Sequence, residues 1–69
     1  MIIWEGVTYV SPKSARAADV NGHRLYVHRA RPRARVFIGR IDGATVGSWA
    51  TLDMAMAQTA KIARDLGLT

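Results

Sequence analysis

Hydrophobic and polar residues alternate over much of the segment 23–50, a pattern typical of β-strands with two distinct faces. Two such runs, HRLYVHRA and ARVFIGRI, flank Arg31-Pro32-Arg33. Pro32 fixes its own φ and lacks an N–H, so the chain is expected to turn here. A second turn at Asp42-Gly43, a pair that favours type I′ geometry, leads into ATVGSWA. The pattern therefore predicts a three-stranded antiparallel meander over residues 23–50.

After Thr51 the hydrophobic period changes from that of a strand to that of a helix. Thr51 is a good N-cap residue, and Gly67 suits the left-handed position that follows a helix. We therefore expect a helix over 52–66, with one apolar stripe formed by Leu52, Ala55, Met56, Thr59, Ile62, Ala63 and Leu66.

The segment before the meander is less regular. Residues 1–12 are rich in β-prone side chains and predict an N-terminal strand or arm. Residues 13–22 are interpreted as a connection, with a short strand at 17–20 as an option and a tight turn at Asn21-Gly22. The 69 residues then make one α+β domain: an arm or strand, a three-stranded meander and one C-terminal helix packed on the sheet.

Pairing about Pro32 assigns the apolar residues of the meander to two faces. Val27 is expected opposite Phe37, and Val36 opposite Trp49. The helix is assigned to the Trp49 face, where Gly47 permits close approach, so Trp49, Ile62, Leu66, Val36 and Ile38 should form one buried cluster. The second face needs another cover, either the N-terminal arm, a partner protein or a second copy in a homodimer, with the homodimer favoured. The residues predicted for this partner or dimer interface are Leu25, Val27, Phe37, Val46 and Trp4.

Composition narrows the function classes. The chain has no cysteine, which excludes disulfides and cysteine-based metal sites or nucleophiles, and no apolar run approaches the length of a membrane span. A cytoplasmic location is expected, without a membrane partner. His23 and His28 should lie on opposite faces of one strand, and the acidic residues are scattered. These observations predict a protein that is not an enzyme and has no catalytic residues, metal site or cofactor.

Basic charge provides the main functional signal. Ten Lys and Arg against five Asp and Glu give a net charge of +5. The stretch HRARPRARVFIGR places five arginines within thirteen residues, with no acidic neighbour. Phosphates are the commonest partners of such clusters, so we expect nucleic-acid binding, with an acidic protein partner or simple protection of a hairpin tip as alternatives. The predicted binding residues are Arg24, Arg29, Arg31, Arg33, Arg35 and Arg40.

The run VGSWATLDMAMAQTAKIA resembles the last strand and helix of two related β-β-β-α DNA-binding domains, those of plant ethylene-response factors and the arm-type domains of phage integrases. Gly47, Trp49, Thr51, Asp53, Ala55 and Ala63 fit that outline. The resemblance covers residues 22–66 and implies duplex DNA as the ligand, with the uncovered sheet face in the major groove. Arg29, Arg35, Arg24 and Arg40 match the family in character, whereas Leu25, Val27, Phe37 and Val46 depart from it.

The chain as a whole is also similar in style to small accessory proteins of phages and prophages from GC-rich bacteria. This similarity supports the alternative function, an inhibitor or adaptor that binds an acidic host protein through the arginine tip and the second apolar face. In that case a buried aromatic residue, Phe37 or Trp4, would be the centre of the binding energy.

Overall fold

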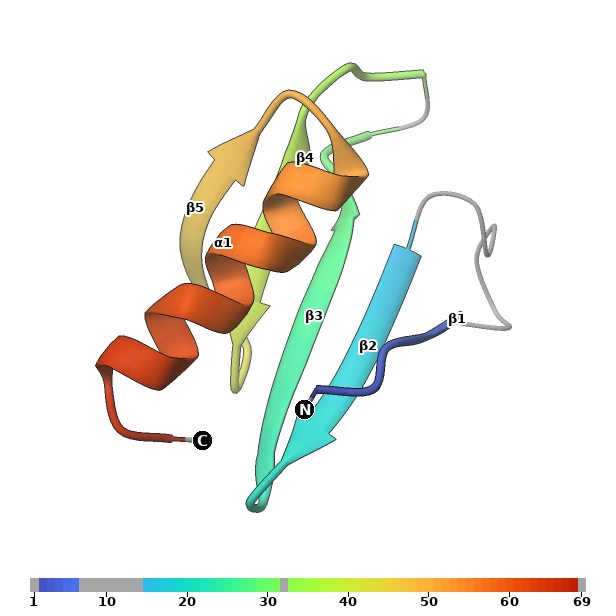
Figure 1. The fold of residues 1–69 in the computed structure, drawn as a ribbon. Coiled ribbons are helices and arrows are strands. Elements are labelled where there is room, and N and C mark those ends of the chain that lie inside the picture. Colours follow the sequence, from blue (N-terminus) through green and yellow to red (C-terminus); the bar gives the residue numbers. More distant parts are fainter. Residues whose placement is uncertain (1, 7–14, 32, 69) are drawn as a thin grey trace.

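The computed structural model describes residues 2–6, 15–31 and 33–68, and it consists of an antiparallel sheet with one helix across it (Figure 1). The elements are β1 (Glu5–Gly6), β2 (Ala15–Val20), β3 (His23–Arg29), β4 (Phe37–Ile41), β5 (Ala44–Trp49) and α1 (Leu52–Asp65). The five strands follow one another in chain order across the sheet. The predicted α+β class is confirmed, but the sheet has five strands instead of three.

The two additional strands come from the N-terminal third of the chain. Strand β2 pairs along its whole length with β3, so the segment interpreted as a connection is largely a strand. Strand β1 adds a two-residue pairing at the outer edge of β2. The remainder of the predicted N-terminal strand, residues 7–12, lies outside the described residues.

Two tight turns join the long strands. Asn21 and Gly22 have φ of 51° and 82°, and Asp42 and Gly43 have φ of 51° and 85°. Two successive residues with positive φ characterise the type I′ turn, whose twist matches that of the flanking strands. Both predicted turns are confirmed.

The register differs from the predicted one in two ways. Between β3 and β4, Val27 lies opposite Gly39 and Arg29 opposite Phe37, a shift of two residues that leaves each side chain on its predicted face. Between β4 and β5, a β-bulge follows the pairing of Arg40 with Thr45. The extra residue of β5 brings Trp49 opposite Phe37, so the predicted pairing of Trp49 with Val36 is wrong.

The helix covers the face that carries Leu25, Val27, Phe37 and Ile41, not the face to which it was assigned. Leu25 and Val27 have no exposed surface, and Phe37 is 7% exposed. Helix residues Ala55, Thr59 and Ala63 are also fully buried. The predicted cluster around Trp49 and Ile38 is therefore wrong, and two of its members are exposed, Val36 by 43% and Leu66 by 62%.

Two residues of the N-terminal arm, Ile2 and Trp4, also pack on this face. Ile2 and Trp4 pack against the cluster of Leu25 and Ile41, and Trp4 also packs against the cluster of Val27 and Phe37. Val46 is half-buried against the first cluster. Of the residues predicted as a partner or dimer interface, three are buried in the chain's own core, Leu25, Val27 and Phe37, and two are half-buried against it, Val46 and Trp4.

Both ends of α1 are capped as predicted. The Thr51 hydroxyl accepts a hydrogen bond from the Met54 N–H at 3.1 Å. At the other end, Gly67 has φ of 78°, and the Leu68 N–H donates to the Ala63 carbonyl at 2.9 Å, as in a Schellman motif. Within the described part of the chain, no helix is long and apolar enough to span a membrane.

Candidate functional site

The loop between β3 and β4 carries three of the predicted binding residues, Arg31, Arg33 and Arg35. Two backbone hydrogen bonds shape it: Ala30 N–H to the Val36 carbonyl at 2.8 Å, and Ala34 N–H to the Arg31 carbonyl at 2.9 Å. The second bond closes a four-residue turn in which Arg33 has φ of 64°. A non-glycine residue in this left-handed region is destabilised by roughly 1–2 kcal/mol. The loop therefore has a defined shape that is held at an energetic cost.

Arg29 differs from the other arginines of the cluster. Its guanidinium lies over the Phe37 ring, 4.8 Å from the centroid, and donates a hydrogen bond to the Ala34 carbonyl. Arg29 is half-buried. It therefore ties the loop to the hydrophobic core, and its charge is directed inward, not toward the outer surface of the loop.

Arg31, Arg33 and Arg35 are exposed, and their guanidinium groups contact no partner among the described residues. Two aspartates are paired with other residues: Asp19 with Arg24 at 2.9 Å, and Asp42 with His23 at 2.7 Å. Three like charges within five residues repel one another, and no anion of the described chain relieves that repulsion. This loop, residues 30–36, is called the arginine loop below.

The sheet face opposite α1 carries a second group of polar and aromatic residues. Tyr26 lies opposite Arg40, and His28 lies opposite Ile38, which in turn lies opposite Ser48. This face is called the open face, and it consists of Tyr26, His28, Ile38, Arg40, Thr45 and Ser48. At its β2 side Tyr26 packs against Ala15 and Ala17, both of which are buried.

Charge on the open face is only partly compensated. Arg40 is half-buried and makes no hydrogen bond or ion pair with any described residue, and its Nε–H is buried without an acceptor. Arg24, farther along β3, is paired with Asp19. Of the two additional arginines predicted for the site, Arg40 is therefore the one whose charge remains unmatched.

The imidazole of His28 is held in a fixed orientation. Its Nδ1 lies 2.8 Å from the Arg29 carbonyl oxygen, an acceptor, so Nδ1 carries the proton and donates. The Tyr26 and His28 rings lie 5.1 Å apart, with an interplanar angle of 32°. His28 lies close to the arginine loop along the chain, because it precedes Arg29 at the end of β3.

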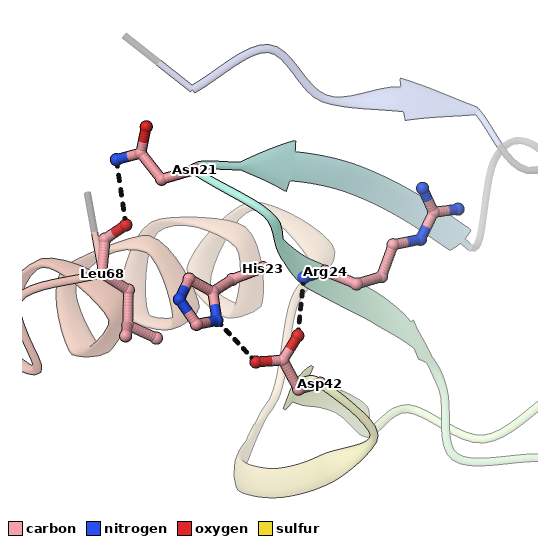
Figure 2. Close-up of polar contacts among 5 residues, drawn as sticks. All are labelled: Asn21, His23, Arg24, Asp42 and Leu68. Carbon is pink, nitrogen blue, oxygen red and sulfur yellow. Dashed lines mark hydrogen bonds and ion pairs between the residues drawn. The ribbon is translucent and has the colours of Figure 1, made fainter.

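The opposite end of the sheet is fastened by polar contacts (Figure 2). The Asp42 carboxylate accepts from the Arg24 backbone N–H at 2.9 Å and lies 2.7 Å from His23 Nδ1. The Asn21 side chain donates to the Leu68 carbonyl at 3.1 Å, which joins the β2–β3 turn to the end of α1. The Arg24 N–H, followed by the His23 ring, lowers the pKa of Asp42 below its usual value.

The lowered pKa of Asp42 predicts a specific pH dependence. Its ionised form stabilises the fold above the unfolded-state pKa of about 3.9, and this contribution is lost as pH falls through the lower folded-state pKa. Asp42→Asn keeps an acceptor and suits the turn but removes the charge. We expect the variant to have a lower urea midpoint than the wild type near neutral pH and the two midpoints to converge as pH falls through the folded-state pKa of Asp42. A difference independent of pH would contradict this assignment.

Sequence reasoning named the arginines but not the other members of the open face. Ile38 was placed on the face to which the helix was assigned, and Tyr26 and His28 were not named as part of a binding site. Among the described residues, no group of three or more His, Asp or Glu side chains is arranged to hold a metal ion. Comparison with protein-family models, with curated proteins and with solved structures gives no match for this chain.

Proposed function

We propose that this protein binds nucleic acid without catalysis and that the arginine loop contacts backbone phosphates. The observation that carries the proposal is the exposure of Arg31, Arg33 and Arg35 on a shaped loop, without a partner for any of the three guanidinium groups among the described residues. Phosphate oxygens match the planar, multidentate geometry of guanidinium groups.

The backbone of Arg33 supports this interpretation. Glycine would adopt φ of 64° without strain, whereas arginine does so at an energetic cost. Such strained residues are concentrated at functional sites, where their side chain is needed in that position. Phosphate contacts position a protein on its ligand without reading its bases, so the loop is expected to bind many sequences alike.

The alternative of a host-protein inhibitor receives less support. That hypothesis relied on Phe37 or Trp4 as an aromatic anchor, but Phe37 is buried in the core and Trp4 is half-buried against it. An acidic protein remains a second candidate ligand for the arginine loop alone. The experiment below distinguishes it from nucleic acid.

The test is the double variant Arg31→Ala, Arg33→Ala, titrated with fluorescent oligonucleotides at several salt concentrations. Each arginine that neutralises a duplex phosphate contributes roughly 0.9 to the slope of log K against log salt. We therefore expect the slope to become shallower by nearly two and affinity at about 0.1 M salt to fall roughly tenfold to hundredfold for every sequence. The strain of positive φ comes from the Cβ atom, which alanine and arginine share, so folding should be unchanged.

The matched control is Lys61→Ala, Arg64→Ala, which removes the same charge from exposed positions on α1. It should lower affinity far less than the loop variant. Equal losses would indicate a general effect of net charge, and no binding to either single or double strands at low salt would exclude the proposal. Direct binding of labelled poly-glutamate, without any nucleic-acid binding, would favour the acidic protein partner.

A further inference from the structure

The open face differs from the arginine loop in chemistry. Its centre is formed by the Tyr26 and His28 rings, the apolar side chain of Ile38 and the unpaired Arg40, with exposed Thr45 and Ser48 on β5. The faces of the two rings and the branched side chain of Ile38 offer apolar contact. These apolar faces gain little from phosphates or from the polar edges of paired bases.

The faces of unpaired bases are the complementary ligand. Bases that are not stacked in a duplex expose large apolar surfaces, which proteins bind with aromatic rings and guanidinium planes. The His28 ring is suited to this contact because its Nδ1 is anchored to the Arg29 carbonyl at 2.8 Å, so it loses little freedom on binding. Arg40 places an uncompensated positive charge beside the rings.

The geometry also connects the two surfaces. His28 and Ile38 form the cross-strand pair next to Arg29 and Phe37, at the end of β3 and β4 from which the arginine loop extends (Figure 1). A nucleic-acid strand whose phosphates contact Arg31, Arg33 or Arg35 would therefore have its next bases over His28 and Ile38. Among the described residues, helix α1 and the arm residues Ile2 and Trp4 pack on the other side of the sheet.

We propose that the open face binds the unpaired bases of a single-stranded nucleic acid, with His28 as a stacking platform and Arg40 as an adjacent cation. This inference rests on the proposed function, because the arginine loop supplies the phosphate contacts. It predicts a preference for single strands over duplexes, in contrast to the insertion into the major groove that the sequence resemblance implied.

The test compares a fluorescein-labelled single strand of about 12 nucleotides, a length within known site sizes, with the same strand annealed to its complement. The single strand should bind more tightly. His28→Ala should weaken binding of the single strand about tenfold and of the duplex less than twofold. His23→Ala, which changes the same residue type at the other end of β3, is the matched control and should leave both affinities unchanged.

A second measurement does not depend on a variant. The Ile38 δ1 methyl resonance should shift upfield when a purine-containing single strand is added, whereas the Ile62 methyl, on α1, should not move. Equal affinity for both ligands with no effect at His28 or Ile38, while the arginine-loop variant weakens both, would overturn this inference and leave the proposed function intact. Loss of all nucleic-acid binding in the wild type would overturn both.

Discussion

Replacing Gly39 with alanine is expected to unfold most of the protein. A Cβ at this position would lie 2.0 Å from the Thr59 Oγ1 and 2.9 Å from Cζ3 of Trp49. Both distances are too short for a real contact, so the buried Thr59 and the indole of Trp49 would both have to move. Overpacking of this kind destabilises by about 3 kcal/mol, most of the stability of a domain this small.

Thr59 provides the way to test that mechanism. Its hydroxyl is fully buried and makes no hydrogen bond with the described residues, so Thr59→Ala alone should change stability little. Combined with Gly39→Ala, it removes the closest clash and should restore part of the lost stability. Urea unfolding of the wild type, both single variants and the double variant measures this coupling. A Gly39→Ala protein as stable as the wild type would show that α1 does not approach β4 at this glycine.

The predictions from the sequence that hold are those that depend on local signals. Local signals predicted the helix from Thr51 to its end near Gly67, and the turns at Asn21-Gly22 and Asp42-Gly43, because each depends on one or two residues with strong backbone preferences. The face covered by the helix depends on contacts between distant segments. Both faces of the meander are apolar in the middle, so alternation alone did not decide between them.

The β-bulge produced the main error. One additional residue in β5, opposite Gly39 and Arg40, moves Trp49 onto the face of Phe37. No turn or proline marks this position in the sequence. The helix was assigned to the face of Trp49, so missing the bulge placed the whole predicted core on the wrong side of the sheet. In the structure, His28 and Ile38 lie on the face that the helix does not cover.

Strand β2 was underestimated for a different reason. Its sequence, ARAADV, is rich in alanine and contains an aspartate, residues that are depleted in strands. Ala15, Ala17 and Ala18 are nevertheless buried beside β3. Tertiary packing here overrides local propensity.

The candidate site was predictable in part. The charge of the arginine cluster could be read directly, and Arg31, Arg33 and Arg35 are exposed as a binding loop requires. The different role of Arg29 could not be read, because its contact with Phe37 arises from the observed cross-strand register.

A second large difference is expected in the reactivity of thiols introduced on the two sheet faces. The chain has no cysteine, so a single introduced thiol reports on one position alone. Val27 is fully buried beneath α1 and the arm, whereas Ile38, on the opposite face, is partly accessible. A thiol at Val27→Cys reacts only when the protein unfolds, and each 1.4 kcal/mol of stability slows that reaction about tenfold.

The rate of alkylation of Val27→Cys and Ile38→Cys under native conditions is therefore the most direct test of the proposed arrangement, in which one face is covered and the other is open to a ligand. We predict that Ile38→Cys reacts about a hundredfold faster than Val27→Cys, and that the two rates become equal in denaturant. Protection of Ile38→Cys together with rapid reaction of Val27→Cys would contradict this arrangement and would place the helix over the face proposed to bind nucleic acid.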